Sequence, residues 1–261
     1  MTVLNRFCDI SAIIMSQKTL WKNTDEGNLE GYTLIIPSVA VGNVGQLACD
    51  LLISSLSMKR ISSIYSPALI PVLGYDPYDL LSNNLSSCCE VYKCAAKNVA
   101  VMQVRAPLVY KYAREFLEDL IVSYKGQGIR DVIILTSSFA HERKYIQTSP
   151  FRYLASELSI YKNKLLSKNW LEHELIDGGV KIFGGGFASL LFEVCKENAM
   201  PCLILYKYCS EGDNIPDAYD MVNSLTDVVP LFSEKKDFLD QLVKPVSWKL
   251  LFGRPAPSDI Y

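Results

Sequence analysis

The most regular pattern of apolar and polar positions lies between Tyr32 and Leu56. It begins with the apolar run Tyr32–Ile36, which is bounded by a glycine and a proline and predicts a short buried strand. The sequence VGNVG follows, and then three leucines at helical spacing, Leu47, Leu51 and Leu52. We therefore predict a strand, a tight turn and a helix, which is the opening unit of many α/β folds.

Most of the remaining chain alternates between predicted strands and predicted helices. The further strands are Arg60–Ser66, Cys89–Ala95, Val99–Arg105, Asp131–Thr136, Val180–Phe183 and Pro201–Tyr208. Five further helices are predicted. One begins after Pro107, one lies around Ser159–Ser167, and the others are Phe187–Asn198, Ala218–Val228 and Glu234–Leu242. This alternation predicts the α/β class, with a mainly parallel sheet flanked by helices on both faces and an antiparallel hairpin at Lys97 and Asn98.

The domain organisation follows from the absence of a linker in the sequence. No stretch is rich enough in Gly, Ser or Pro to divide the chain, so we predict a single α/β domain over residues 1–261. Residues 1–30 are expected to be an N-terminal appendage. Residues 244–261, which contain Pro245, Pro255 and Pro257, are expected to form an extended C-terminal tail.

Composition excludes several classes of protein. Hydrophobic residues make up 49% of the chain and charged residues 21%, which is enough to build a core and is not typical of disorder. The 26 basic and 28 acidic residues give a net charge of −2, so neither nucleic acid nor an anionic membrane is an expected partner. No apolar run approaches the roughly 18 residues of a membrane span, and no N-terminal signal is visible.

The eight cysteines form no CxxC pair, and only two histidines are present. Zinc sites need clustered Cys and His at short spacing, so we predict no metal and no cofactor. Most cysteines lie in apolar runs, which favours buried, reduced thiols in a cytosolic protein. We therefore expect a cytoplasmic and nuclear location.

Two glycine turns are candidate anion sites, because backbone N–H groups at a helix N-terminus attract phosphate. The turn VGNVG matches neither GxGxxG nor a phosphate loop, and no lysine follows it, which favours a packed strand-to-helix connection. The turn Gly184–Gly186 before a predicted helix has the better geometry for an anion, but it also lacks a nearby basic residue.

Two further stretches carry residue types that could catalyse reactions. Glu211, Asp213 and Asn214 follow a predicted buried strand, where α/β enzymes place acid–base or metal-binding groups, although the same residues could cap the next helix. Ser137 or Ser138 together with His141 suggests a hydrolase pair, but the G-x-S-x-G elbow is missing, which favours an exposed loop. We predict no catalytic residue.

The C-terminal tail contains candidate contact residues. Prolines keep such a segment extended, and aromatic residues are common anchors in protein pockets. The candidates for packing and partner contact are Trp248, Leu251, Phe252, Ile260 and Tyr261.

Several segments together resemble the proteasome assembly chaperone two family. They are PSVAVGNVGQLACDLL (37–52), SPFRYL (149–154), KNW (168–170), SEGDNIPDA (210–218) and WKLLFG (248–253). The resemblance implies a nucleoside-phosphorylase-like sheet without an active site. It also implies a heterodimer with proteasome assembly chaperone one that binds the proteasome α-ring. In some relatives a hydrophobic residue, a tyrosine and one further residue dock between α subunits. Ile260 and Tyr261 match the first two positions, and no third residue follows them.

Two hypotheses about function follow. The first is a non-enzymatic chaperone of 20S proteasome assembly, whose heterodimer promotes α-ring formation and prevents off-pathway α-ring dimers, with part of the opening unit in the dimer interface. The alternative is a nucleoside-phosphorylase-like or hydrolase-type enzyme. It would bind phosphate at Gly184–Gly186 and use Glu211 or Asp213 as an acid–base group.

Overall fold

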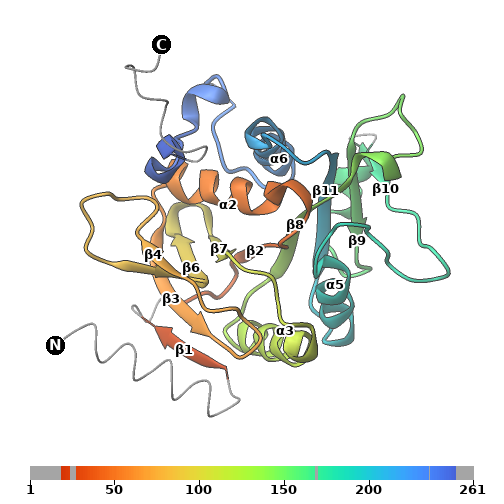
Figure 1. Cartoon of the computed structure of the whole chain (residues 1–261). Helices are drawn as coiled ribbons and strands as arrows, with labels where there is room; N and C mark the ends of the chain where they lie inside the picture. Colours follow the sequence, from red (N-terminus) through yellow and green to blue (C-terminus); the bar gives the residue numbers. More distant parts are fainter. Residues whose placement is uncertain (1–18, 24–27, 168–169, 235, 251–261) are drawn as a thin grey trace.

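The computed structural model describes residues 19–23, 28–167, 170–234 and 236–250. Nine strands of these residues form one sheet in the order β1-β3-β6-β7-β2-β8-β11-β9-β10, and β4 and β5 form a separate pair (Figure 1). The strands are β1 Leu20–Asn23, β2 Thr33–Pro37, β3 Lys59–Tyr65, β4 Leu73–Tyr75, β5 Leu85–Ser87, β6 Cys89–Cys94, β7 Val99–Val104, β8 Asp131–Phe139, β9 Phe151–Ala155, β10 Leu171–Glu172 and β11 Cys202–Cys209. The helices are α2 Val44–Ser55, α3 Tyr110–Gly126, α4 Lys162–Ser167, α5 Ala188–Glu197 and α6 Ile215–Val228.

The centre of the sheet is parallel, as the alternating pattern predicts. Strands β7, β2, β8 and β11 run parallel to one another. Strands β6 and β7 form the predicted hairpin, in which Asn98 takes the left-handed conformation with φ 51°. Antiparallel pairing extends further than this hairpin, because β3 and β1 add to β6 on one side and β9 pairs with β11 on the other.

Alternate residues of the central strands face two different helical layers. Leu34 and Ile36 of β2 belong to the core cluster that includes residues of α3 and α5, whereas Ile35 belongs to the cluster with residues of α2 and α6. Figure 1 shows these two pairs of helices on opposite faces of the sheet. Burial of each such side chain stabilises the fold by roughly 1.5–3 kcal/mol. The predicted α/β class with helices on both faces is therefore confirmed.

Two predicted elements are wrong. Val180–Phe183 is not a strand; the Phe183 carbonyl accepts hydrogen bonds from the backbone of Phe139 and from the Ser138 hydroxyl, outside any ladder. In the described residues of Glu234–Leu242, the only helical element is the 3-10 turn Leu239–Gln241. There the Gln241 side chain exchanges hydrogen bonds with the backbone N–H and carbonyl of Ser233, and such side-chain bonds compete with a helix.

Other findings extend the sequence interpretation. Phe151–Ala155 is a strand that the pattern did not predict, because Arg152 and Tyr153 interrupt its apolar character. In the segment 1–30, Leu20–Asn23 is an edge strand paired with β3, and Leu29 is 2% exposed in the core. The cysteines of the described residues are unpaired, and all but Cys94 are buried.

Candidate interaction surfaces

Both glycine turns lie at the carboxyl end of the parallel strands, where they pack against protein. The N–H of Val41 donates to the carbonyl of Gly184 at 2.9 Å, so the two turns are hydrogen-bonded to each other. Gly42 has φ +65°, and a Cβ there would lie 2.6 Å from Oδ1 of Asn214. Gly186 has φ +61°, and a Cβ there would overlap the Val39 carbonyl oxygen. These positions need glycine for close packing with neighbouring loops.

The anion-binding geometry expected at Gly184–Gly186 is replaced by internal hydrogen bonds. The Ser38 hydroxyl donates to the carbonyl of Gly185 at 2.8 Å and accepts from the N–H of Phe187 at 2.8 Å. The N–H of Gly185 donates to Ile182, and Ala188 donates to Gly185. The N–H groups of Gly185, Phe187 and Ala188 at the start of α5 are therefore used within the protein.

The loop from Glu211 to Asn214 connects β11 to α6. Glu211 and Asp213 are exposed, and Oδ1 of Asp213 accepts a hydrogen bond from the N–H of Ile215 at 3.1 Å. Asn214 is buried; its Nδ2 donates to the Ser210 carbonyl and to Oδ2 of Asp217. Asp213 therefore caps the start of α6, whereas Asn214, which stands at the N-cap position, makes no side-chain capping bond. The described part of the chain contains no group of three or more His, Cys, Asp or Glu arranged to hold a metal.

The candidate hydrolase pair is not assembled. The hydroxyl of Ser137 donates to the Val41 carbonyl, and that of Ser138 donates to the Phe183 carbonyl at 2.9 Å. The exposed His141 ring stacks on Phe139 with ring centroids 5.2 Å apart. Neither serine hydroxyl is hydrogen-bonded to His141.

Only one of the five tail candidates lies in the described residues. Trp248 is 8% exposed and packs in the core cluster of α2 and α6. Its neighbour Ser247 donates its N–H to the Pro77 carbonyl at 3.1 Å, so the start of the tail lies against the segment between β4 and β5. The other candidates, Leu251, Phe252, Ile260 and Tyr261, lie outside the described residues.

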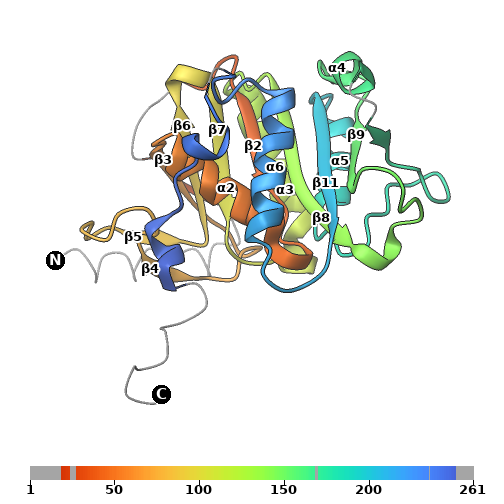
Figure 2. The same ribbon diagram turned by 90° about the horizontal axis from the view of Figure 1, so that it is seen from above.

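Figure 2 shows β4 and β5 on the side of the molecule away from β9. The segment 70–81, on and beside β4, exposes six large apolar side chains. They are Ile70, Val72, Leu73, Tyr75, Leu80 and Leu81, which we call the apolar hairpin surface. Leu81 is 92% exposed and Tyr75 is 87% exposed. The charged residues of the segment are Asp76 and Asp79, so its margin is acidic. A concentration of exposed apolar side chains in one segment is a candidate interaction site.

A buried polar network holds this surface to the sheet. Oδ1 of Asp50 on α2 accepts hydrogen bonds from the Tyr78 hydroxyl at 2.5 Å, from Gln103 at 2.7 Å and from Arg105 at 2.9 Å. Burial and the Asp50 carboxylate raise the pKa of Tyr78 well above its ordinary value, so the hydroxyl stays a donor. Burial alone would lower the pKa of Arg105, but Asp50 outweighs it and raises that pKa.

The sequence interpretation missed this surface. Prolines and aspartates interrupt the apolar run of this segment, so no strand or helix is predicted there. The available signal was the high proportion of apolar residues in PALIPVLGYDPYDLL, which forms no helical or strand period.

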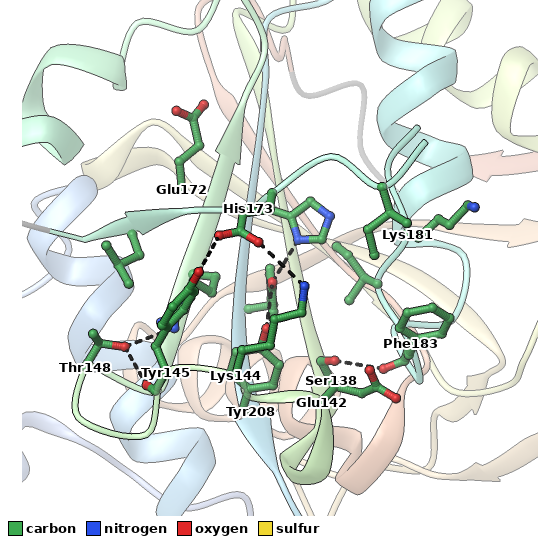
Figure 3. A pocket seen from close by; sticks show the side chains of 16 residues that line it. Ser138, Glu142, Lys144, Tyr145, Thr148, Glu172, His173, Lys181, Phe183 and Tyr208 are labelled. Atoms are coloured by element: carbon green, nitrogen blue, oxygen red, sulfur yellow. Dashed lines mark hydrogen bonds and ion pairs between the residues drawn. The ribbon is translucent and has the colours of Figure 1, made fainter. Parts of the chain in front are cut away.

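A cavity of about 410 Å³ lies beside β9 and β10, at the edge of the sheet far from β4 and β5 (Figure 3). Its lining residues come from segments that are distant in sequence. They include Ser138, Lys144, Tyr145, Thr148, Arg152, His173, Glu174, Ile182, Phe183, Tyr206 and Tyr208. No contiguous sequence pattern could have predicted this combination.

Among the described residues, no helix is both long and apolar enough to cross a membrane. The helices instead serve the two core layers.

Comparison with curated proteins reveals close relatives over nearly the whole chain. Proteasome assembly chaperone 2 of Homo sapiens is 35% identical over 254 residues, covering 90% of this chain and 96% of the relative. Proteasome assembly chaperone 2 of Danio rerio is 36% identical over 251 residues, with the same coverage of both chains. These relatives confirm the resemblance that the sequence segments indicate.

Comparison with solved structures confirms the fold. The crystal structure of Pyrococcus furiosus PbaA, described as an archaeal homolog of proteasome-assembly chaperone, has a TM-score of 0.65. It is 18% identical and covers 86% of this chain and 91% of its own. The model of the PAC2 family matches residues 34–231, from β2 to the end of the segment after α6, and the chain therefore belongs to the PAC2 family.

Proposed function

We propose that this chain is a non-enzymatic chaperone of 20S proteasome assembly. It acts as a heterodimer with proteasome assembly chaperone one, and the pair binds the proteasome α-ring, promotes its formation and prevents off-pathway α-ring dimers. The names of the relatives in Homo sapiens and Danio rerio support the assembly role. The packing of both glycine turns against neighbouring loops supports a role without catalysis.

The observation that carries the proposal is the apolar hairpin surface. Six large apolar side chains within residues 70–81 are exposed to solvent, on a segment held in place by the buried Asp50 network. A hydrophobic patch on a fixed frame is suited to a stable protein interface, because little ordering is needed on binding. We assign this surface to the partner chaperone, whose complementary face would be apolar with a basic margin.

The C-terminal tail gives the proposal a second contact. Trp248 and the hydrogen bond from Ser247 to Pro77 fix the start of the tail beside the apolar hairpin surface. We propose that the residues after it, with Ile260 and Tyr261 at the end, reach the α-ring. We further propose that the heterodimer works in the cytoplasm and the nucleus.

The proposal is tested by purification of the full chain after co-expression with the partner chaperone and with α-type proteasome subunits. We expect a complex of the chain with the partner, and of the pair with α subunits. A monomeric chain that retains neither protein would overturn the proposal. Deletion of Ile260 and Tyr261 is the narrower test: an unchanged α-ring affinity would remove the tail from the mechanism and leave the chaperone role intact.

A further inference from the structure

The cavity beside β9 and β10 contains a buried cation without an acidic partner. Arg152 is only 4% exposed. Its guanidinium donates to the carbonyls of Ser149 at 2.6 Å and Phe151 at 2.7 Å, and to the Thr148 hydroxyl at 3.0 Å. These acceptors are all neutral, and no carboxylate of the described residues lies within 4.0 Å of the guanidinium. Buried charges are normally paired, so this cation lacks the counter-charge that would stabilise it.

The Arg152 guanidinium lies against the lining of the cavity. Its central carbon is 5.5 Å from the ring centroid of Tyr208, and its Thr148 acceptor is also a lining residue. The acidic residues in the lining are Glu142, Glu172 and Glu174, and none of them forms an ion pair with Arg152. Glu174 accepts a hydrogen bond from the Tyr145 hydroxyl at 3.2 Å and pairs with Lys144 at 3.7 Å, and Glu142 lies 3.5 Å from Nε2 of His141. The Glu174 carboxylate is therefore paired with other residues at the rim and is not the counter-charge of Arg152.

The other side of the cavity offers apolar and hydrogen-bonding groups. Phe183, which is 48% exposed, lies across the mouth from Tyr145 (Figure 3). Deeper in, Nδ1 of His173 is hydrogen-bonded to the Tyr206 hydroxyl at 2.8 Å, whereas the buried Nε2 of His173 has no partner. A volume of about 410 Å³ is in the range of ligand pockets and holds one or two amino-acid residues.

We propose that this cavity, the Arg152 pocket, binds a carboxylate of a partner polypeptide together with an adjacent aromatic or aliphatic side chain. The carboxylate pairs with Arg152, and the side chain packs between Phe183 and Tyr145. Arginine suits this role because its planar donors match a carboxylate. The carboxylate belongs either to a chain end or to an Asp or Glu side chain. The pocket is at the opposite edge of the sheet from the apolar hairpin surface, so the inference does not rest on the proposed heterodimer.

The test measures peptide binding to the full chain, together with its partner where the two co-purify. The probes are acetyl-Ala-Phe with a free carboxylate and acetyl-Phe-Glu amide, each compared by calorimetry with its neutral counterpart, acetyl-Ala-Phe amide and acetyl-Phe-Gln amide. We expect one of the acids to bind about tenfold or more tighter than its neutral counterpart, because charged hydrogen bonds are the stronger ones. The acid that binds identifies the source of the carboxylate.

Equal affinity of both acids and their neutral counterparts, or no binding of any probe at millimolar concentration, would overturn the proposal. Arg152→Met is expected to abolish the preference for the acid, and Arg152→Lys to retain part of it. Arg114→Met is the matched control, because this exposed arginine on α3 pairs with Glu118 and Glu197. A folded Arg152→Met protein that still prefers the acid would contradict the proposal. If that variant does not fold, the proposal is decided by the affinities of the unaltered chain for the acids and for their neutral counterparts.

Discussion

Val41 donates its backbone N–H to the carbonyl oxygen of Gly184 at 2.9 Å, which joins the two glycine turns of the sequence. A turn that holds a phosphate must leave its N–H groups free and leave room for the ligand. Here the N–H groups of Val41, Gly185 and Phe187 are used within the protein, and the space beside Gly186 is filled by the Val39 carbonyl. The glycines therefore bring protein segments together at the carboxyl end of the sheet.

Gly186→Ala is expected to destabilise the chain more than Gly178→Ala. Both glycines have positive φ, +61° and +75°, so both substitutions introduce backbone strain of about 1 kcal/mol. A Cβ at Gly178 meets nothing within 4 Å, whereas one at Gly186 overlaps the Val39 carbonyl. We expect an additional loss of about 1–3 kcal/mol in the free energy of unfolding by urea. Equal losses for the two variants would show that the turn at Gly186 is not tightly packed.

Phosphate and nucleosides are expected to leave the melting temperature of the chain unchanged. A ligand that binds only the native state raises its stability by mass action, so an enzyme of nucleoside-phosphorylase type would show a concentration-dependent rise. Sulfate at the same concentration is the control for the general stabilising effect of such anions. A rise with phosphate or a nucleoside that sulfate does not reproduce would revive the enzymatic alternative.

The pattern of apolar residues predicted the strands and helices whose side chains are buried in the core. The apolar run in β8 is buried on both faces, and the strand, turn and helix at Tyr32–Leu56 are present. Phe151–Ala155 was missed because it includes Arg152, whose charge lies in the lining of a cavity. The predicted helix at Glu234–Leu242 fails because the Gln241 side chain binds the backbone of Ser233, a contact that no hydrophobic pattern reports.

Arg105→Met is expected to cost about 3–5 kcal/mol of unfolding free energy, because it leaves the buried Asp50 carboxylate without its cation. The double variant Asp50→Leu with Arg105→Met should lose less than the sum of the two single variants, since no unpaired charge remains. Urea unfolding of the three variants measures the coupling. Strict additivity would mean that Asp50 and Arg105 do not stabilise each other in the folded chain.

His173 is expected to make the chain less stable in acid. Burial lowers the pKa of His173 in the folded state below the unfolded value of about 6.5. The unfolded chain therefore binds the proton more readily, so stability is complete above the unfolded pKa and falls as the pH drops through it toward the folded pKa. The neighbouring Glu174 carboxylate opposes this shift without cancelling it.

His173→Gln should reduce the loss of urea stability between pH values above and below about 6.5. His141→Gln is the matched control, because the His141 side chain is 74% exposed. These are the two histidines of the chain, so the pair of variants covers the histidine contribution. The prediction would be contradicted if the His173→Gln variant and the unaltered chain lost the same amount of urea stability on acidification.

The candidate sites could be predicted only in part. Trp248, a sequence candidate for packing and partner contact, lies in the core and is 8% exposed. The Arg152 pocket could not be predicted, because Arg152, His173 and Tyr206 come together only through the pairing of β9 with β11 and β10. The apolar hairpin surface was missed because Tyr75 and Leu81 lie in a segment broken by prolines, which has no regular period.

The most direct test of the proposed chaperone role is the affinity of the full chain for proteasome assembly chaperone one. Leu80→Ser with Leu81→Ser removes two leucines of the apolar hairpin surface that are 67% and 92% exposed. Leu158→Ser with Leu166→Ser, at 56% and 57% exposure outside that surface, is the matched control. We expect the first pair to weaken binding by about tenfold or more, as loss of central interface residues does, and the control pair to leave it unchanged. Equal affinity of both double variants and the unaltered chain would contradict the assignment of this surface to the partner.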